Sequence, residues 1–544
     1  MSEATITATP SISNSLTALK GVLGGIVGAE NIRDDDASRA LFSEDIWDKS
    51  AFTTMLIVSP ANTTELAAVV KAAADAGVSI APRGAGMSYT GGYYPADAHT
   101  ISLDTSRMNR VLKVSPDDMT ITVEAGASWK TIDDTLAPMG LRLPFWGPMS
   151  GIWSTIGGGL SNLNAMFGCG HYGTSSESVI AITMVLADGS VLKTGARGPD
   201  GDTPFYRHYG PDLAGLFMGD AGTLGIKAEI TFRLMQRPAF EDSASFSFKT
   251  GPIMLQALGE MARAGIAAET CGFDPGLTKV RMKRMGMTAD VKALGAVMLK
   301  EKNIFKSLLA AFKIAKAGRS FIEEEEYPLH ITAEGRCAEA VAADLAKARE
   351  IAKKYDGVEI ANTIAKVIRA MPFPPPNSIL GPEGESWIPV HGQVSLSNAP
   401  KMFAEIKAYF DSMQADYDRL GIHNGFLFST LHNNAIVMEP VFFWPKGYRP
   451  IHESMVEPAH LAKLKKLGDA EEATAFVTAG REMVKRICEK YGCAHFQIGR
   501  SYKYRESRNP AFLRVLDAVK ATVDPKGQFN PGCLGFPPAK GDAQ

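Results

Sequence analysis

The stretch Ser79-Ile-Ala-Pro-Arg-Gly-Ala-Gly-Met-Ser-Tyr-Thr-Gly-Gly92 joins an apolar, strand-like run to a glycine-rich loop, and it is the most informative part of this 544-residue chain. Glycine has no Cβ, so the backbone N–H groups of such a loop can approach a diphosphate closely. A Rossmann loop would lead straight into a helix, whereas here Tyr93-Tyr94-Pro95 leads to another apolar strand at 100–104. The stretch therefore predicts a flavin pyrophosphate loop, with an ordinary glycine-rich turn as the alternative.

Composition and charge exclude several classes of protein. Hydrophobic residues make up 45% of the chain and charged residues 21%, which is typical of a globular protein. The formal net charge is −2, so no overall field favours nucleic acid or an anionic membrane. Six scattered cysteines match no common zinc or redox motif, and the N-terminus lacks the basic region of a secretory signal. We therefore expect a cytoplasmic protein that does not bind nucleic acid.

The order of expected elements indicates an α+β protein with more than one core. A strand at 54–58 is followed by a helix at 65–74, with Asn62 or Thr63 as its N-cap, and further strands follow at 78–81, 99–103, 111–114 and 120–124. Two more glycine-rich turns lie beside strand ends, at 157–159 and 219–225. From about residue 240 longer helices occur, such as 339–354, which predicts a second domain.

Several motifs together resemble the FAD domain of the vanillyl-alcohol oxidase/p-cresol methylhydroxylase (PCMH) superfamily. They are Arg83–Ser88 with Gly91 and Gly92, Asp104–Val114, Val123–Gly126, Thr155–Gly159 and Asp220–Ile226, and Val523–Gly532 resembles the family's closing segment. The resemblance implies a two-subdomain, PCMH-type FAD-binding domain and an α+β cap or substrate domain with an antiparallel sheet covered by helices. We expect a helical arm at 1–49, the FAD-binding domain at 50–238, the cap at 239–500 and a C-terminal segment at 501–544 that returns to the FAD domain.

FAD is the cofactor that this resemblance implies. The residues expected to bind it are Pro82, Arg83, Gly84, Ala85, Gly86, Met87, Ser88, Gly91, Gly92, Ser154, Thr155, Gly157, Gly158, Gly159, Gly222, Gly225, Ile226 and Asn530. Some relatives attach FAD through a histidine in the first loop, where this chain has Met87. We therefore expect noncovalent FAD, with covalent attachment through His391 as the alternative.

The resemblance to the branch that oxidises 4-alkylphenols implies the substrate-binding residues. Arg500–Arg505 resembles the tyrosine-arginine motif of that branch, and Tyr89 resembles its other tyrosine. We expect Tyr89, Tyr504 and Arg505 to bind the substrate as a phenolate, because a guanidinium and hydroxyl donors favour the ionised form. A hydride then leaves the benzylic carbon for flavin N5 and gives a quinone methide. His432 and Glu439 are the candidates for a base.

Two other functions remain open at this point. D-2-hydroxy-acid dehydrogenases of the same superfamily use a histidine pair with a Glu-His segment, often around a metal, but Gly425 and the segment 494–499 depart from that pattern. We therefore expect no metal site, and we keep a lactate- or glycolate-like substrate as the first alternative. A flavin-binding subunit without turnover is the second. Oxygen, a cytochrome or a quinone can serve as electron acceptor, and a homo-oligomer is compatible with the sequence.

Overall fold

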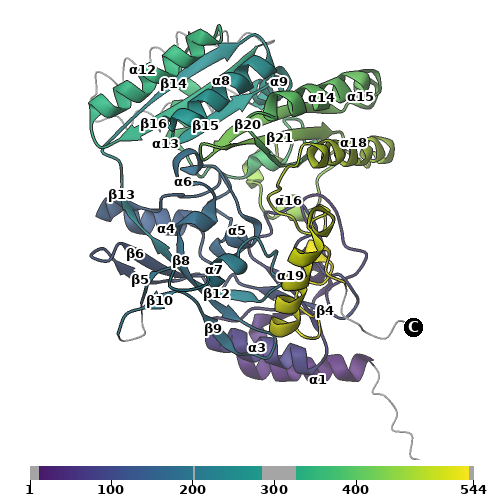
Figure 1. The fold of residues 1–544 in the computed structure, drawn as a ribbon. Coiled ribbons are helices and arrows are strands. Elements are labelled where there is room, and N and C mark those ends of the chain that lie inside the picture. The colour runs from purple at the N-terminus through teal and green to yellow at the C-terminus, as the bar shows by residue number, and fades with distance from the viewer. Residues whose placement is uncertain (1–11, 200–202, 285–325, 538–544) are drawn as a thin grey trace, which may run out of the picture.

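The computed structural model describes residues 12–199, 203–284 and 326–537, and these form two lobes (Figure 1). The lower lobe in Figure 1 contains two sheets from the first half of the chain, and the upper lobe contains one large sheet. The last α-helix of the described residues, α19 (Pro510–Val523), lies again beside the lower lobe. The α+β class predicted from the sequence is confirmed.

The first sheet of the lower lobe has the strand order β1-β2-β4-β3, with β2 and β3 both parallel to β4. Its helix α3 begins after Asn62, whose side chain accepts a hydrogen bond from the Glu65 N–H at 2.9 Å, so Asn62 is the N-cap of the two candidates. The elements are β1 (Ile32–Arg33), β2 (Ile57–Val58), β3 (Ser79–Arg83), β4 (Thr100–Asp104), α1 (Ile12–Val27), α2 (Asp36–Phe42) and α3 (Thr63–Asp75).

The segment expected as a separate helical arm is part of this first sheet and its core. Strand β1 pairs antiparallel with β2, and Leu19 and Leu23 of α1 are buried in the same core as Val69 and Val70 of α3. Burial of these apolar side chains makes the described part of the segment, from residue 12 to residue 49, integral to the lobe. The expectation of an arm is therefore corrected.

The second sheet of the lower lobe is antiparallel, in the order β5-β6-β12-β8-β9. Strand β8, between β12 and β9, is a run of β-branched and other apolar residues, and every residue in it is buried. The strands are β5 (Val111–Ser115), β6 (Thr120–Glu124), β8 (Val179–Val185), β9 (Val191–Lys193) and β12 (Ile226–Arg233), with α4 (Trp129–Leu136), α5 (Ile156–Asn162), α6 (Cys169–Tyr172) and α7 (Leu213–Leu216). Two short ribbons accompany them, β7 (Leu141–Arg142) with β13 (Met235–Gln236) and β10 (Ala196–Arg197) with β11 (Pro204–Tyr206).

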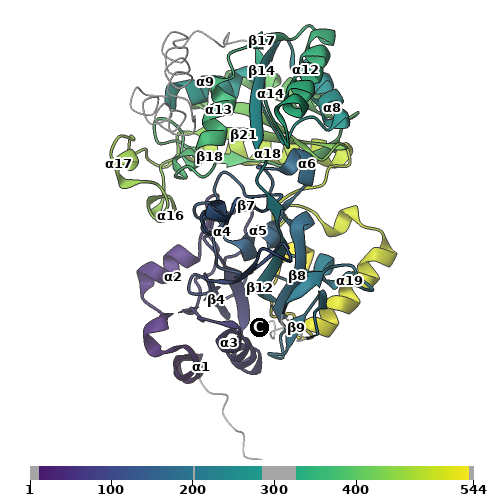
Figure 2. The ribbon, with the colours of Figure 1, turned by 90° about the vertical axis from the view of Figure 1, so that its left-hand side faces the viewer.

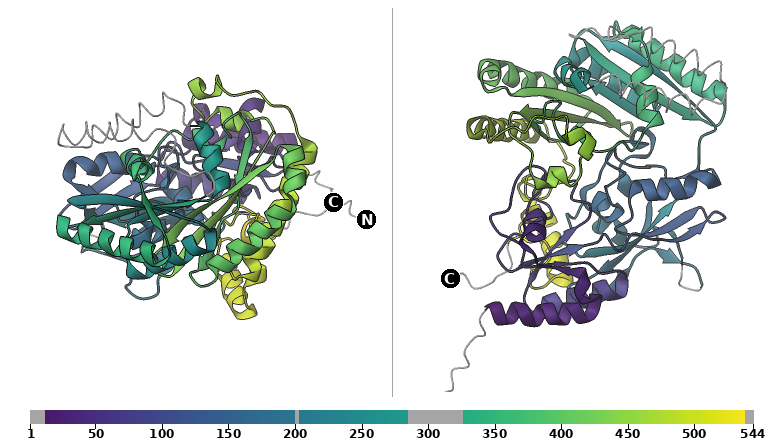
Figure 3. Two further views of the ribbon diagram at one scale, coloured as in Figure 1. Left: turned by 90° about the horizontal axis from the view of Figure 1, so that it is seen from above. Right: turned by 180° about the vertical axis from the view of Figure 1, so that it is seen from behind.

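The upper lobe is an antiparallel sheet of eight strands in the order β17-β14-β16-β15-β20-β21-β18, with β19 also paired to β21. Helices α8, α12, α14 and α18 pack against it and share its largest apolar core (Figures 2 and 3). The predicted antiparallel sheet covered by helices is thus confirmed. The strands are β14 (Phe240–Phe248), β15 (Glu269–Phe273), β16 (Tyr327–Gly335), β17 (Val358–Ile360), β18 (Ser386–Pro389), β19 (Gly392–Ser395), β20 (His423–Leu431) and β21 (Ala435–Trp444). The helices are α8 (Gly251–Ala264), α9 (Pro275–Arg284), α12 (Ala338–Lys354), α13 (Thr363–Ala370), α14 (Ala399–Ser412), α15 (Gln414–Leu420), α16 (Pro450–Glu453), α17 (Pro458–Leu461) and α18 (Glu471–Lys490).

A buried ion cluster joins the two lobes. Arg369 of α13 pairs with Glu269 of β15 and Glu334 of β16, and Arg142 of β7 in the lower lobe pairs with Glu334 as well. The Arg369 Nε also donates to Glu241 at 2.8 Å. Because the side chains of Arg142, Arg369, Glu269 and Glu334 are all 7% exposed or less, removing one partner would leave a buried charge uncompensated.

The chain after α19 returns to the first sheet, as the sequence predicts. Ile80 and Phe529 form a parallel bridge, in which the Ile80 N–H donates to the Gln528 carbonyl at 2.9 Å and the Asn530 N–H donates to the Ile80 carbonyl at 2.8 Å. The tail therefore lies beside strand β3, next to the first glycine-rich loop.

Candidate active site

The first glycine-rich loop presents a run of backbone donors to a pocket between the lobes. Within the described residues, the N–H groups of Gly84, Ala85, Gly86, Met87 and Ser88 donate no hydrogen bond, and all five residues line the pocket. Unpaired N–H groups of this kind bind anionic oxygens. The run therefore fits the diphosphate of a dinucleotide cofactor.

Side chains behind the loop hold it in this conformation. The Tyr93 hydroxyl donates to the Gly86 carbonyl at 2.6 Å, and the Asp45 carboxylate accepts from the Gly91 N–H at 2.7 Å. Arg83 donates to the Leu41 carbonyl at 2.8 Å, and its guanidinium lies over the Tyr93 ring. Arg83 thus lines the pocket, but its guanidinium is engaged in fixing the loop.

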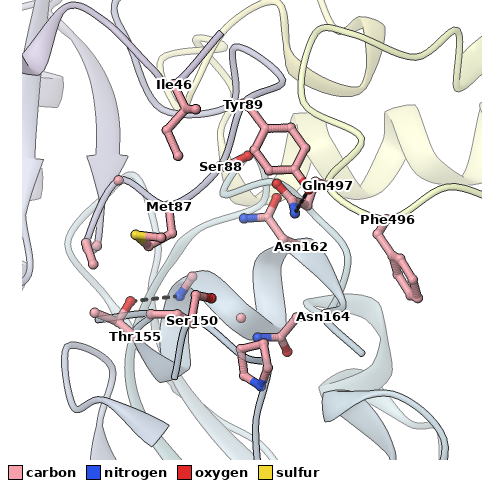
Figure 4. Close-up of a pocket in the computed structure, with 18 of the residues that line it drawn as sticks. Ile46, Met87, Ser88, Tyr89, Ser150, Thr155, Asn162, Asn164, Phe496 and Gln497 are labelled. Carbon is pink, nitrogen blue, oxygen red and sulfur yellow. Dashed lines mark hydrogen bonds between the residues drawn. The ribbon is translucent and has the colours of Figure 1, made fainter. Parts of the chain in front are cut away.

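Two other glycine-rich segments close the same pocket, as the sequence predicts. Thr155 caps α5 by accepting from the Gly158 N–H at 3.3 Å (Figure 4). A Cβ on Gly84 would lie 2.2 Å from the Thr155 Oγ1, so the first two segments touch only because residue 84 is glycine. The expected cofactor residues that line the pocket are Pro82, Arg83, Gly84, Ala85, Gly86, Met87, Ser88, Gly92, Ser154, Thr155, Gly157, Gly158, Gly159, Gly222, Gly225 and Ile226.

Gly91 and Asn530 do not line the pocket, unlike the other expected cofactor residues. Asn530 is fully buried, and its side-chain amide donates to the Gly92 carbonyl at 2.7 Å and to the Ala221 carbonyl at 2.6 Å. Because Gly92 belongs to the first loop and Ala221 to the third, Asn530 ties two cofactor loops together from behind.

The part of the pocket under the upper sheet contains a connected set of polar side chains. The Tyr89 hydroxyl lies 2.6 Å from the His391 Nε2. The Gln497 Nε2 donates to the same hydroxyl at 3.3 Å (Figure 4). Glu439 of β21 lines this part of the pocket as well. Of the predicted substrate-side residues, Tyr89 and Glu439 are thus brought together, and His391 joins them.

The structure does not bring Tyr504, Arg505 or His432 to the pocket. Arg505 lies in a short 3-10 helix and pairs with Asp517 at 2.7 Å, and Tyr504 lies beneath the Arg508 guanidinium. His432 is in the turn between β20 and β21, where its backbone N–H donates to the Cys169 carbonyl. The expectation that these side chains contact the substrate is therefore corrected.

Tyr502, two positions before Tyr504, does not line the pocket but contacts His391, which does. It is 7% exposed, and its hydroxyl accepts from the His391 backbone N–H at 3.0 Å. The His495 ring stacks on the Tyr502 ring with centroids 4.0 Å apart, and its Nδ1 donates to the His391 carbonyl at 2.5 Å. Tyr502 and His495 thus fix the backbone of His391 on both sides.

Further pocket residues have no motif in the sequence that would have marked them. Pro374, Pro375 and Pro376 line the pocket, although no site residue was expected in this part of the chain. Other residues found only by the structure include Met149, Ser150, Asn162, Asn164, Lys227, Trp387, Ser429, Phe443, Phe496 and Gln497. Most stand outside glycine-rich turns, so only the fold brings them together.

Burial controls the protonation of the polar side chains under the upper sheet. It lowers the pKa of His391 from 6.5 to about 3, with His495 and Arg481 adding to the effect, so the imidazole is neutral near pH 7. Burial, together with the carboxylate of Glu439, raises the pKa of Tyr89 well above 10. Both partners of the short Tyr89–His391 contact are therefore uncharged.

The pocket offers little positive charge to a substrate. Lys227 donates to Asp220 at 2.6 Å and to Ser161 at 2.8 Å, and Arg83 is engaged with Leu41. Among the described residues, no group of three or more histidine, cysteine or carboxylate side chains is arranged to hold a metal ion. In the same part of the chain, no helix combines the length and apolarity needed to cross a bilayer.

The pocket thus lies between a two-sheet lobe with three glycine-rich loops and a lobe with one large antiparallel sheet. Residues 54–195 match the FAD binding domain family. D-lactate dehydrogenase [cytochrome] 1 of Saccharomyces cerevisiae mitochondria is 33% identical over 213 residues, which are 39% of this chain and 35% of that protein. Glycolate oxidase subunit GlcD of Bacillus subtilis is 27% identical over 49% of this chain and 56% of its own length. The chain thus spans about a third to a little over half of these relatives.

A structure of p-cresol methylhydroxylase with substrate bound shares the fold over 96% of this chain and 97% of its own, with a TM-score of 0.70 and 16% identity. This likeness shows the fold, and the matched FAD domain agrees with the resemblance to the vanillyl-alcohol oxidase/p-cresol methylhydroxylase superfamily. FAD is the cofactor of this chain, and the unpaired N–H groups of the first loop fit the FAD diphosphate.

Proposed function

We propose that this chain is an FAD-dependent oxidoreductase whose electron donor is a small, uncharged aromatic alcohol or para-substituted phenol. The observation that carries the proposal is the character of the pocket under the upper sheet. Trp387, Phe443 and Phe496 supply aromatic and apolar surface there, beside the polar residues Tyr89 and Glu439. An apolar pocket with few polar groups favours an aromatic ring that carries one oriented polar substituent.

Charge supports an uncharged donor over an anionic one. Glu439 lines the pocket, while the guanidinium of Arg83 and the ammonium of Lys227 are engaged with other groups. A carboxylate or phenolate would therefore be placed near a carboxyl group without an opposite charge of its own. This differs from the phenolate expected from the sequence, because Arg505 lies outside the pocket.

The residues of the pocket would have different roles in the oxidation. Bound FAD supplies the hydride acceptor. As the hydride leaves the carbon, the hydroxyl must lose its proton, and Glu439 is positioned in this part of the pocket as the base. Tyr89 and the aromatic side chains orient the ring, because a small displacement of the reacting carbon costs a large part of the rate.

A D-2-hydroxy acid is the second candidate donor, and the sequence relatives favour it. The matched proteins include a D-lactate dehydrogenase and a glycolate oxidase subunit. The match, however, covers 39% and 49% of this chain, and the hydroxy acids are anions that the pocket does not complement with charge. The two candidates therefore make opposite predictions for the same experiment.

Anaerobic mixing of the FAD-loaded protein with separate donors tests the proposal. We expect 4-hydroxybenzyl alcohol or 4-methylphenol to bleach the flavin absorbance, and D-lactate to leave it unchanged. Bleaching by D-lactate alone would favour the second candidate, and bleaching by no donor would favour a subunit without turnover. Glu439→Gln should slow bleaching by about a hundred-fold or more if Glu439 is the base. The exposed Glu453→Gln is the control, and its rate should equal that of the natural chain.

A further inference from the structure

The end of helix α18 brings two cysteine side chains together beside the upper sheet. The Cys493 N–H donates to the Cys488 carbonyl at 3.0 Å. The Gly492 N–H donates to the Glu489 carbonyl at the same distance, and Gly492 has a φ of 68°. These two hydrogen bonds and the left-handed glycine define a Schellman motif, whose first and sixth residues place their side chains in contact. Those two residues are Cys488 and Cys493.

Both sulfur atoms lie against the same residue of strand β19. A Cβ on Gly392 would lie 3.2 Å from the Cys488 Sγ and 3.5 Å from the Cys493 Sγ, so both thiols fit under this strand because residue 392 is glycine. The two thiols also interact with each other, since the Cys493 thiol, together with burial, raises the pKa of Cys488 well above its ordinary value. The backbone hydrogen bond between the two residues keeps their Cα atoms close, as a disulfide requires.

The two thiols differ in their access to solvent. Cys488 is fully buried, whereas Cys493 is partly exposed and its thiol donates to the Met402 sulfur at 3.2 Å. An oxidant in solution therefore reaches Cys493 first, and Cys488 lies beneath it as the second thiol. Cysteines that sense oxidants are accessible to solvent and often have such a second, resolving cysteine beside them.

Short stretches of chain connect the two cysteines to the pocket. Gly392, which contacts both sulfurs, directly follows His391, and His391 lines the pocket. Cys493 is followed by the segment 494–497, whose first residue exchanges backbone hydrogen bonds of 2.9 Å and 3.1 Å with Gln393. The last two residues of this segment line the pocket (Figure 4). A new covalent bond between the two sulfurs therefore acts on two stretches of the pocket wall.

We propose that Cys488 and Cys493, which we call the thiol pair, are a reversible redox site: hydrogen peroxide converts them to a disulfide, and the disulfide alters the surroundings of the bound FAD. The Cys493 sulfur attacks one oxygen of the peroxide, the O–O bond breaks, and a sulfenic acid and one water form. The Cys488 sulfur then attacks the Cys493 sulfur, the S–O bond breaks, and the disulfide and a second water form. Two electrons and two protons thus pass from the thiols to the peroxide. The proposal goes beyond the proposed function and holds for any electron donor.

Peptide mapping of the FAD-loaded protein after exposure to hydrogen peroxide tests the thiol pair. Free thiols are alkylated before digestion to prevent exchange. Trypsin cleaves after Arg486, Lys490 and Arg500, so the two cysteines leave in separate peptides, 487–490 and 491–500, unless a disulfide joins them. We expect the joined peptides in most chains after peroxide, and in almost none after a further treatment with dithiothreitol. Two unmodified thiols, or over-oxidation of the partly exposed thiol to a sulfinic acid without joined peptides, would overturn the proposal.

Variants test the order of the two steps. In Cys488→Ser the sulfenic acid on Cys493 has no resolving thiol, so dimedone should label Cys493 after peroxide treatment. In Cys493→Ser the buried Cys488 should stay reduced, and its oxidation there would contradict the assigned order. Because Cys493 is partly exposed, Cys493→Ser tests the pairing even if substitution of Cys488 impairs folding. Cys337→Ser, at the exposed N-cap of α12, is the matched control and should keep the full yield of joined peptides.

The absorbance spectrum of the bound FAD tests the link between the thiol pair and the pocket. Spectra are recorded after the reagents have been removed. We expect peroxide to shift the flavin bands, dithiothreitol to reverse the shift, and Cys493→Ser to show no shift. A disulfide that leaves the spectrum unchanged would overturn the link to the pocket. The proposed oxidation of an aromatic alcohol is tested separately by bleaching of the flavin, and its failure would leave the thiol pair in place.

Discussion

Replacing Arg369 by alanine should destabilise the protein by about 3–5 kcal/mol, the usual cost of breaking a buried ion pair. Arg369 pairs with Glu241, Glu269 and Glu334, and its guanidinium lies 4.9 Å from the centre of the Trp146 ring. The variant keeps the three carboxyl groups and loses the cation that faces all of them. Arg142 still pairs with Glu334, but Glu269 is left in a buried site whose low polarity already raises its pKa.

The pH dependence of this loss follows from the carboxyl groups. Burial favours the neutral form of Glu334, but the guanidinium groups of Arg142 and Arg369 outweigh burial and lower its pKa. In the natural chain this stabilisation is present above the pKa of the unfolded carboxyl and is lost as the pH falls through the lower folded value. In the variant the pKa of Glu334 and Glu269 should rise, so protonation relieves the unpaired charge. The deficit should therefore be smaller at pH 5 than at pH 8.

Equilibrium urea unfolding of the FAD-loaded protein, followed by tryptophan fluorescence, measures both the loss of unfolding free energy in Arg369→Ala and its dependence on pH. Arg419→Ala is the control, because Arg419 is 52% exposed and its ion pairs with Asp416 and Glu472 contribute less than about 1 kcal/mol. A loss of unfolding free energy below about 1 kcal/mol for Arg369→Ala at pH 7 would show that the buried ion cluster does not stabilise the protein as expected. A difference in unfolding free energy that grows on acidification would contradict the expected protonation of Glu269 and Glu334.

Three further outcomes are expected. Gly84→Ala should weaken FAD binding by at least about ten-fold, because the new Cβ would lie 2.2 Å from the Thr155 Oγ1. The purified variant should therefore show a lower ratio of flavin to protein absorbance. Gly21→Ala is the control: its Cβ would meet no atom within 4 Å, so the variant should keep its full FAD content. Arg505→Ala should change phenol affinity by less than about two-fold in a titration followed by flavin absorbance, since a direct charge partner would cost far more. The pKa of His391 is about 3 when folded and 6.5 when unfolded, so the imidazole should reduce the free energy of unfolding of the natural chain by about 1.4 kcal/mol per pH unit as the pH falls from about 6 to 4. In urea titrations, the free energy of unfolding of His391→Gln should fall less steeply with pH by this amount. Equal pH slopes for the two chains would contradict the low pKa of His391.

The cofactor half of the site could be predicted from the sequence because its signals are local. The glycine-rich loops at 84–92, 157–159 and 222–225 need special backbone conformations or close approaches, and those needs are visible in single residues. Gly222, with a φ of 70°, lies against Pro82 of the first loop. The antiparallel upper sheet was also predictable, but from the family resemblance and not from any one strand.

The substrate half could not be predicted, because its residues meet only through tertiary structure. Tyr502 and Tyr504 are two positions apart and look alike in sequence, yet Tyr502 is buried against His391 and Tyr504 is not. The short 3-10 helix at Arg505–Ser507 turns the second tyrosine and the arginine away from the pocket. Gln497 carried no signal in the sequence, since a glutamine in a loop is usually solvated.

The bridge between Ile80 and Phe529 sets an order of events during synthesis of the protein. Strand β3 and the first glycine-rich loop emerge from the ribosome early, but the partner of Ile80 lies about 450 positions later in the chain. Contacts so distant in sequence form late and slowly, because the intervening chain must first be ordered. Until then Asn530 does not hold the first and third loops together. The first and third cofactor loops therefore gain this tie only after residue 530, and with it the whole upper lobe, has been made.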